Sequence, residues 1–324
     1  MRVTLVTTWD TACGIAEYAY YLVEALRAAD PRLEITPLTD LHPDAVLRTL
    51  PRFDSAPDLD WVWLNYHAAL HSQWTPGYVQ ELQARKVKVG ITFHDTGVPN
   101  SAQCKALHAV ADVMVIHEPA EDLPGAVYLR QGIPSAPVGP YHTSVAAYGR
   151  PVVGTLGFPF PWKNYDLLAE ASALAGWALL LLAPNATEAQ VARWRELNPH
   201  LEVHTEFTNR VAALAMLAGC DATAFLYANA NTGTSAAIRQ GIAARKPVIA
   251  TSANGCRQFR DLMEDPVGRY AIDWVAELTV DTVAGTLATV DIGGVSAPVV
   301  RLAEQDSWAK AGRVYAQLLR GERP

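Results

Sequence analysis

The run Thr232, Gly233, Thr234 and Ser235 brings three hydroxyl groups and a glycine together at the start of a predicted helix. Backbone N–H groups at a helix start attract anions, and a glycine lets a ligand approach the backbone closely. The hydroxyls add further donors, so the run suits a diphosphate. Helix capping is the alternative, but it explains one Ser or Thr rather than three hydroxyls in a row. We therefore predict phosphate binding here.

A second polar stretch, TFHDTGVPN, places His94 and Asp95 directly after an apolar run that predicts a strand. A histidine beside a carboxylate can bind hydroxyls or transfer protons, because it titrates near neutrality. A turn or helix cap formed by Asp95 is the alternative. We favour a functional pair because the end of this strand faces the predicted ligand crevice.

A third stretch, TTWDTACGIAEYA, passes from a predicted strand into a helix at Gly14. A glycine in this position permits close approach of the backbone to a ligand, and the first helical turn offers N–H groups to an anion. A tight turn explains the same residues equally well, and Glu17 in the first turn also complements the helix dipole.

Several other motifs carry less weight. His67 and His71 have helical i, i+4 spacing without an evident third metal ligand. Asp58 and Asp60 precede a strand rather than follow it, which argues against a metal-diphosphate site. The sequence lacks both a GxGxxG fingerprint and a GxxxxGK[ST] loop, which disfavours dehydrogenases and P-loop NTPases.

The elements that position these stretches follow from the alternation of β-branched runs with helical patterns. The first half predicts strands at 2–8, 33–38, 60–66, 87–93 and 111–117, with an amphipathic helix at 15–29. Strands separated by helices imply βαβ units and a parallel sheet. Ligands of such sheets bind at the carboxyl ends of the strands, where the three stretches lie.

Residues 132–150 interrupt the pattern with three prolines and three glycines, which indicates a linker. The alternation then resumes, with strands at 151–158, 177–183, 201–207, 221–227 and 246–252 and helices at 163–175, 187–197 and 208–217. We predict two doubly wound Rossmann-like α/β domains facing a cleft, 1–148 and 149–305. Residues 306–324 should form a terminal helix that packs back across the domains, with Trp308, Ala311, Tyr315 and Leu318 on one stripe.

Composition sets limits on the partners. The chain has 324 residues, half of them apolar, and a formal charge of -7 without any Lys/Arg block, so nucleic acid is an unfavourable partner. The longest strongly apolar run, 175–183, is too short to span a bilayer. Four separated cysteines without zinc-site spacing predict reduced thiols. We expect a cytoplasmic protein without a transmembrane segment.

Taken in chain order, the stretches resemble a GT-B glycosyltransferase, in particular the nucleotide-sugar-dependent, retaining family 4. CGIAEYAYYLVEAL resembles the family's first glycine-rich loop and helix, and ITFHDT resembles its strand ending in histidine. ADVMVIHEP and VYLRQGIP resemble the two strands before its linker. GTLGFPFPWKNYDLLAEA resembles the loop with the phosphate-contacting lysine, and CDATAFLYANANTGTSAAIRQGIAARKPVIATSANG the donor-binding core. SWAKAGRVYAQLL resembles the terminal helix, so the likeness covers nearly the whole chain.

The resemblance implies roles for individual residues. It places His94 and Asp95 near the reaction centre and Lys163 on the leaving diphosphate. It places Glu17 and His67 on the acceptor side. The donor set it implies is Gly14, Lys163, Asn164, Phe207, Thr208, Thr232, Gly233, Thr234, Ser235 and Gln240.

The sequence departs from the family pattern at two kinds of position. The family usually carries two glutamates in the last donor-binding region, where this chain has Thr232 and Gln240. Gln240 can hydrogen-bond a ribose, but without charge. The arginine that often precedes the family's lysine aligns near Phe158, so Lys163 should carry more of the charge compensation.

The function expected from this resemblance is transfer of a sugar from a nucleoside diphosphate sugar to an acceptor hydroxyl, with retention and without an obligatory metal or other cofactor. If the reaction inverts instead, His94 or Asp95 is the best general base. The alternatives are a nucleotide-sugar binding protein of the same fold that lacks turnover, and a GT-B epimerase or phosphorylase.

Overall fold

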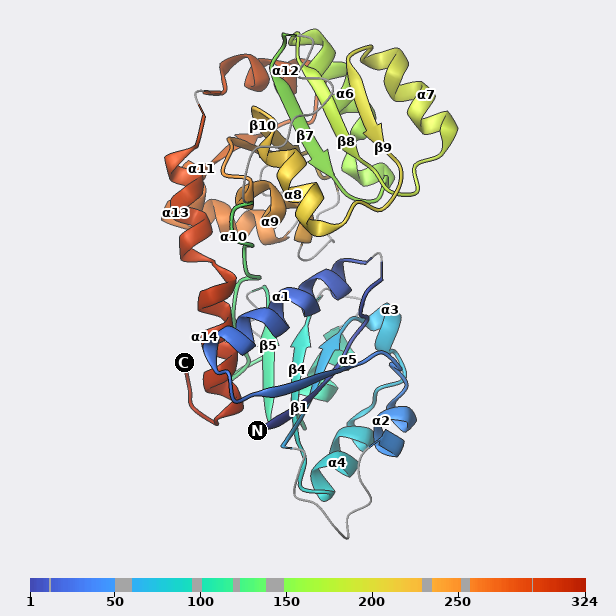
Figure 1. The fold of residues 1–324 in the computed structure, drawn as a ribbon, viewed down its shortest axis with the longest axis vertical. Coiled ribbons are helices and arrows are strands. Elements are labelled where there is room, and N and C mark those ends of the chain that lie inside the picture. Colours follow the sequence, from blue (N-terminus) through green and yellow to red (C-terminus); the bar gives the residue numbers. More distant parts are fainter. Residues whose placement is uncertain are drawn as a thin grey trace. The chain divides into compact units, whose positions relative to one another are not determined.

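The computed structural model describes residues 1–11, 13–49, 60–94, 101–118, 123–137, 149–228, 235–251, 257–292 and 294–324. The chain forms two compact units (Figure 1). Unit 1 comprises Met1–Gly132 and Trp308–Pro324, and unit 2 comprises Ile133–Ser307. The expected boundary between 148 and 149 stays a prediction, because residues 138–148 lie outside the described ranges.

Unit 1 is a parallel six-stranded sheet in the order β2-β1-β3-β4-β5-β6. Its elements are β1 (Arg2–Val6), α1 (Gly14–Ala29), β2 (Glu34–Leu38), α2 (Pro43–Thr49), β3 (Trp61–Tyr66), α3 (Ala68–His71), α4 (Pro76–Ala84), β4 (Lys88–Phe93), α5 (Ser101–His108), β5 (Val113–Ile116), β6 (Val127–Tyr128) and α14 (Trp308–Leu319).

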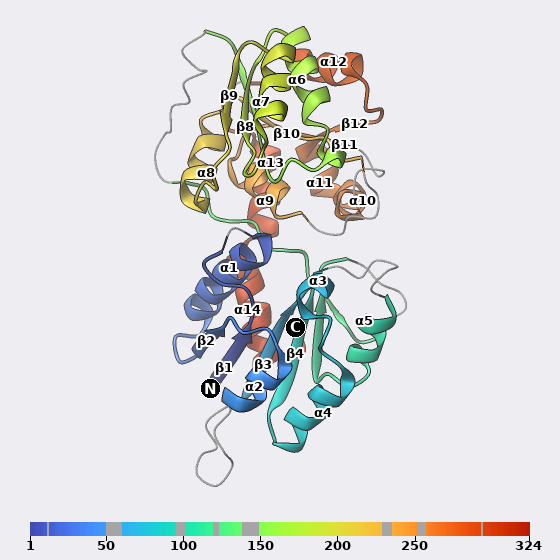
Figure 2. The same ribbon diagram turned by 90° about the vertical axis from the view of Figure 1, so that its right-hand side faces the viewer.

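Helices cover both faces of the unit 1 sheet. Helices α1 and α14 lie side by side on one face, and α2, α4 and α5 cover the other (Figure 2). The strands alternate between the two cores: Trp61 and Trp63 pack toward α1 and α14, whereas Val62 and Leu64 pack on the opposite face. Since successive side chains of a strand point to opposite faces, β4 directs its own residues in the same alternation.

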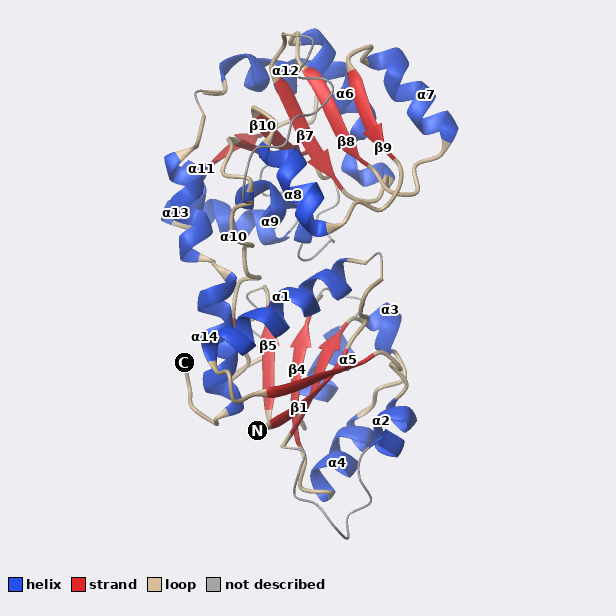
Figure 3. Ribbon diagram, viewed as in Figure 1, coloured by secondary structure: helices blue, strands red, loops and turns tan. Residues whose placement is uncertain are grey.

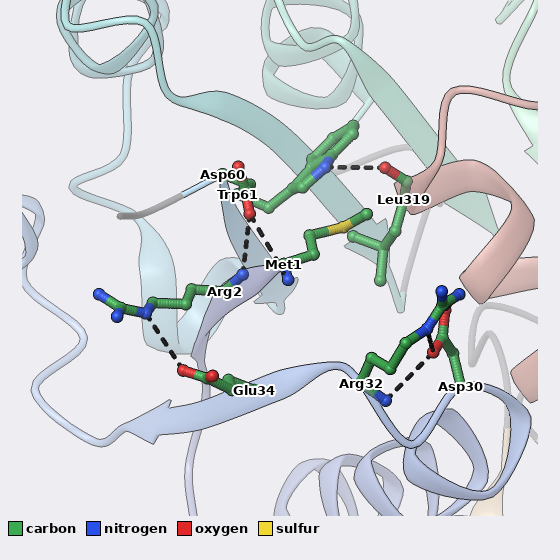
Figure 4. A network of polar contacts seen from close by, with 8 residues as sticks. All are labelled: Met1, Arg2, Asp30, Arg32, Glu34, Asp60, Trp61 and Leu319. Atoms are coloured by element: carbon green, nitrogen blue, oxygen red, sulfur yellow. Dashed lines mark hydrogen bonds and ion pairs between the residues drawn. The ribbon is translucent and has the colours of Figure 1, made fainter. Parts of the chain in front are cut away.

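Helix α14 is anchored on unit 1 along its whole length. The four residues of the predicted stripe, Trp308, Ala311, Tyr315 and Leu318, are all buried. At its C-terminal end the Leu319 carbonyl accepts a 3.0 Å hydrogen bond from Trp61 Nε1 (Figure 4). Gly312 lets α14 approach α1 closely, because a Cβ there would lie 2.5 Å from the carbonyl oxygen of Ala25.

Unit 2 is a second parallel six-stranded sheet, in the order β12-β11-β10-β7-β8-β9. Figure 3 shows β7, β8 and β9 of this sheet side by side. Its elements are β7 (Val152–Leu156), the 3-10 turn η3 (Pro161–Lys163), α6 (Tyr165–Leu174), β8 (Ala178–Leu182), α7 (Glu188–Leu197), β9 (Leu201–His204), α8 (Arg210–Ala218), β10 (Ala222–Phe225), α9 (Ala236–Ala243), β11 (Val248–Thr251), α10 (Arg257–Glu264), α11 (Pro266–Ala271), β12 (Ile272–Val275), α12 (Val280–Thr289) and α13 (Ala297–Gln305).

The strand order of unit 2 matches the doubly wound Rossmann pattern, with β7 and β10 as the central pair where the winding reverses. Helices α6, α7 and α12 pack on one face of the sheet, and α8, α9 and α13 pack on the other. The predicted fold class, two doubly wound parallel α/β units, is therefore confirmed.

Two details of the predicted elements are wrong. The helix expected at 163–175 is divided, because Asn164 adopts a left-handed conformation, with φ of 53°, between η3 and α6. Strand β12 was not predicted, since it follows α11 directly and Asp273 interrupts its apolar residues. None of the helices in the described ranges combines the length and apolar character needed to cross a bilayer.

Candidate functional site

Lys163 lies at the point of unit 2 where doubly wound sheets bind ligands. It ends the turn η3, in the connection that follows β7, and β7 is adjacent to β10 at the reversal of strand order. The Ala228 N–H, just after β10, donates a 2.8 Å hydrogen bond to the carbonyl of Trp162. The two carboxyl ends of the central strands are thereby tied together at Lys163.

The Lys163 ammonium is buried, and none of the described residues pairs with it through an anionic group. Its side chain is only 7% exposed, and burial lowers its pKa to about 8. The Nζ atom lies 5.5 Å from the Trp162 ring centroid and 5.3 Å from that of Tyr227. Within the described parts of the chain no carboxylate forms an ion pair with it. Since a buried charge is costly unless it is paired, Lys163 is a candidate contact for an anion.

Gly157 makes room for this ammonium. It follows β7 with a φ of +127°, a conformation that favours glycine, and a Cβ built on it would overlap Lys163 Nζ. The Tyr165 hydroxyl donates a 2.8 Å hydrogen bond to the Gly157 carbonyl. Asn164 Nδ2 donates a 2.7 Å hydrogen bond to the Leu226 carbonyl, so Asn164 holds η3 against the end of β10.

The start of α9 belongs to the same edge of the sheet. Ser235 occupies the N-cap position but makes no side-chain cap, and its hydroxyl lies 2.9 Å from the hydroxyl of Tyr227 instead. Tyr227 therefore contacts both the Lys163 ammonium and the helix start. Gln240 is buried in α9. Thr232, Gly233 and Thr234, predicted to hold phosphates, lie outside the described residues.

Phe207 and Thr208 follow β9, which β8 separates from β7 in the sheet. Phe207 is 48% exposed, and the next residue, Asn209, caps α8 by accepting a 3.0 Å hydrogen bond from the Ala212 N–H. Their predicted contact with a nucleotide base stays a prediction.

In unit 1, a hydrogen-bonded chain links the carboxyl ends of three strands. Asn65 at the end of β3 donates through Nδ2 to Thr7 Oγ1 at 3.0 Å and to the Ile15 carbonyl at 3.2 Å. Its Oδ1 therefore accepts, and the partner is Nε2 of His94, the residue after β4. This arrangement assigns the His94 proton to Nε2 and leaves Nδ1 as an acceptor.

His94 is buried and neutral. Burial lowers the pKa of His94 well below its ordinary value, and the nearby His117, His67 and His71 lower it further. The His94 and His117 ring centroids are 5.3 Å apart. A neutral imidazole of this tautomer accepts a proton or hydrogen bond at Nδ1 and does not supply a positive charge. Its predicted partner Asp95 lies outside the described residues.

Gly14, predicted for the donor, and Glu17 and His67, predicted for the acceptor side, lie near the same edge of the unit 1 sheet. Gly14 is the first residue of α1, and Cys13 before it makes no side-chain cap. Glu17 lies in the first turn of α1. His67 caps the short helix α3, because its Nδ1 accepts a 3.3 Å hydrogen bond from the Ala69 N–H. A structural role for His67 is thus visible, and its acceptor role stays a prediction.

The buried His71 leads us to expect that the folded protein loses stability in acid. Burial lowers its pKa from 6.5 to about 4, and its Nε2 atom has no hydrogen-bond partner in the described structure. Between pH 6.5 and pH 4 the unfolded chain binds a proton that the folded chain does not, so the free energy of unfolding falls as the pH falls. We expect His71 to account for a loss of about 2 kcal/mol between pH 6.5 and pH 5.

Urea unfolding of the wild type and of His71→Asn at both pH values checks this effect. The variant should lose less stability on acidification, whereas His108→Asn, on the partly exposed end of α5, should follow the wild type. Equal pH dependence in all three proteins would contradict the buried neutral state of His71.

Several contributing residues carried no sequence signal that could be recognised in advance. Gly157 offered one general signal, because a glycine just after a strand permits close approach of another group to the backbone. Tyr227, Tyr165 and Asn65 are ordinary strand-end and helix residues in the sequence. Only the pairing of β7 with β10 and of β1 with β3 brings them into the sites.

Cys13, Cys104 and Cys220 are free thiols, and Cys256 lies outside the described residues. Among the residues that the structure describes, no group of three or more His, Cys, Asp or Glu side chains could hold a metal ion.

Comparison with known proteins identifies the fold. The chain is similar to AviGT4, a glycosyltransferase involved in avilamycin A biosynthesis, with 16% identity, a TM-score of 0.58, and coverage of 99% of this chain and 97% of that one. It is also similar to a UDP-forming α,α-trehalose-phosphate synthase from Burkholderia xenovorans in complex with glucose-6-phosphate, with 11% identity, a TM-score of 0.62 and coverage of 99% and 100%.

A trehalose-6-phosphate synthase studied for enzymatic glycosyl transfer with retention matches over 100% of both chains, with 12% identity and a TM-score of 0.63. The chain has the GT-B fold. No protein-family model and no curated protein sequence matches it. Membership of family 4 within the GT-B fold therefore stays a prediction. Lys163 and His94 each lie at the carboxyl edge of the sheet in one of the two GT-B units.

Proposed function

We propose that this GT-B protein transfers a sugar from a nucleoside diphosphate sugar to an acceptor hydroxyl, with retention and without a metal. The observation that carries the proposal is the buried Lys163 ammonium, which has no carboxylate partner among the described residues. It lies over the ring of Tyr227, whose hydroxyl meets Ser235 at the start of α9. A diphosphate supplies the missing anion, and helix N–H groups supply further donors.

The reaction breaks the bond between the anomeric carbon and the diphosphate oxygen and forms a bond to the acceptor oxygen on the same face. The departing diphosphate takes the electron pair, and Lys163 and the α9 N-terminus stabilise its negative charge. The acceptor proton passes to a phosphate oxygen. This scheme requires no protein nucleophile. The comparison with a retaining synthase of the same fold supports it.

His94 serves binding of the sugar in this scheme. The imidazole contacts the sugar, while Asn65 fixes the ring through Nε2. Because the imidazole stays neutral, it adds no positive charge near the oxocarbenium-like centre. Gln240 hydrogen-bonds the ribose, and the acceptor enters from the side of Glu17 and His67. We place the protein in the cytoplasm.

Calorimetry with UDP, GDP, ADP, dTDP and CDP, with and without magnesium, tests the donor site. We expect one nucleotide to bind selectively, independently of magnesium, and to stabilise the protein by about 2.7 kcal/mol at a hundred times its dissociation constant. The failure of all five to bind would refute the donor site.

Transfer is then tested with the sugar donors of the nucleotide that binds. The anomeric configuration of the product, read by NMR, should equal that of the donor, and an inverted product would refute the retaining scheme. Binding without turnover on any hydroxyl acceptor would favour the non-catalytic alternative, and the replacement of the family glutamates by Thr232 and Gln240 would then be its cause.

A further inference from the structure

Tyr18 of α1 lies at the centre of the polar edge of unit 1. It is 1% exposed, and its ring stands edge-on to His94, with centroids 4.5 Å apart and an interplanar angle of 86°. The same ring lies 5.1 Å from His117. Two residues therefore hold the His94 imidazole in different ways. Asn65 makes a hydrogen bond with Nε2, and Tyr18 packs against the ring.

The Tyr18 hydroxyl is held by the last helix of the chain. It lies 2.6 Å from the hydroxyl of Tyr315 on α14, and that hydroxyl lies 2.9 Å from Thr92 Oγ1. Trp63 Nε1 donates a 2.9 Å hydrogen bond to the same Thr92 oxygen. The result is a continuous buried chain from β3 through β4 and α14 to α1.

The chain of hydroxyls and His94 share one face of the sheet. Thr92 and His94 are two residues apart on β4 and its extension, so both point toward α1 and α14. Gly90, two residues earlier, faces the same side, where a Cβ would overlap the Trp63 indole. The end of β4 is therefore held on this face by the hydrogen bond between Thr92 and Tyr315. Tyr18 holds Tyr315 in turn through its own hydroxyl.

Helix α14 has contacts with unit 1 besides the hydrogen bonds of the Tyr315 hydroxyl. Trp308 at its start packs edge-on to Tyr18 at 4.9 Å and stacks on Tyr21 at 5.9 Å, and Trp61 bonds the Leu319 carbonyl at its end. Removal of the Tyr315 hydroxyl should thus leave the helix docked while it disconnects Tyr18 from Thr92. Burial raises the pKa of Tyr18 well above its ordinary value, so the hydroxyl pair stays protonated.

We infer that Tyr18 and Tyr315 are positioning residues that hold the His94 imidazole in the orientation the sugar requires, so that α14 completes the unit 1 site. This inference rests on the proposed function for the role of His94 in transfer. The orientation of His94 itself is a property of the protein alone. Residues at the far end of the sequence thereby determine the geometry of a site that the first hundred residues form.

The test uses full-length Tyr18→Phe, Tyr315→Phe and Tyr18→Leu, with Tyr21→Phe as the matched control on the same helix. NMR of the histidine ring signals should show His94 shifted in Tyr315→Phe and more strongly in Tyr18→Leu, and unchanged in Tyr21→Phe. With sugar transfer as the second readout, kcat should fall by about tenfold or more, in keeping with the cost of a misplaced group. Nucleotide affinity should stay within about twofold, because Lys163 belongs to the other unit.

The two readouts separate the possible failures. If the wild type makes no glycoside, the proposed function fails, yet the NMR comparison still decides whether Tyr18 and Tyr315 orient His94. Wild-type His94 signals in a folded Tyr315→Phe and a folded Tyr18→Phe would overturn the inference. If Tyr18→Leu does not fold, these two conservative variants provide the decision.

Discussion

Lys163→Met is expected to weaken nucleoside diphosphate binding by about 10- to 100-fold and, at the same time, to stabilise the ligand-free protein. The loss of affinity follows from removal of a charge-assisted contact, worth about 1.5 to 3 kcal/mol. Calorimetry with the nucleotide that the wild type prefers measures it. Unchanged affinity would show that this lysine does not contact the diphosphate.

The gain in stability follows from the same burial. The Lys163 pKa falls from 10.5 to about 8, and each unit corresponds to about 1.4 kcal/mol, so the buried charge costs the folded state roughly 3 kcal/mol at pH 7. Methionine fills a similar volume without a charge. Between pH 8 and pH 10.5 the unfolded chain holds the proton more tightly, so this group makes the wild type more stable as the pH rises. The advantage of the variant should accordingly shrink over that range.

Lys246→Met is the matched control. Lys246 follows α9 in the same unit and is only partly buried, so its replacement should change neither nucleotide affinity nor stability by more than about 0.5 kcal/mol. A Lys163→Met protein less stable than the wild type would contradict an unpaired buried ammonium. In that case an anion from the chain itself would be its partner.

The fold was largely predictable because its strands are long enough to show a pattern. Eleven strands were expected, ten from their pattern and VYLRQGIP from the resemblance, and each corresponds to a strand of the two sheets. Buried parallel strands read as continuous apolar runs, such as ALLLL in β8. The helices and the strand of segment 257–305 were not predicted. Strand β12 follows α11 directly, without an intervening turn, and Asp273 interrupts its apolar residues.

The candidate site was predictable as a set of loops but not as a set of contacts. His94 was predicted from its place after a strand and Lys163 from the resemblance, and both follow strands at the expected edge. Their physical state did not follow from the sequence, because burial depends on residues distant along the chain. Tyr227 lies 64 residues beyond Lys163 and Tyr315 lies 221 beyond His94, and no local period links either pair. The strongest polar run, at 232–235, has only Ser235 within the described residues.

Gly157→Ala is expected to weaken nucleotide binding about as much as Lys163→Met while it shifts stability in the opposite direction. A Cβ at this position would overlap the Lys163 ammonium, so the side chain must leave its place over Trp162 and Tyr227. The φ of +127° adds backbone strain of about 1 to 3 kcal/mol for any residue with a Cβ. We expect the free energy of unfolding to fall by at least about 2 kcal/mol.

Two further variants separate the overlap from the strain. Gly176→Ala carries strain from a φ of +79° in the same unit, but the nearest atom to its Cβ is Arg150 Nη1 at 3.9 Å, so it should lose stability and keep nucleotide affinity. In Gly157→Ala combined with Lys163→Ala the overlap disappears and only the strain remains. The double variant should therefore be more stable than the sum of the two single changes predicts, by about 1 kcal/mol or more. Strict additivity would mean that Gly157 and Lys163 do not share this space, and the close approach after β7 would then have no part in holding the ammonium.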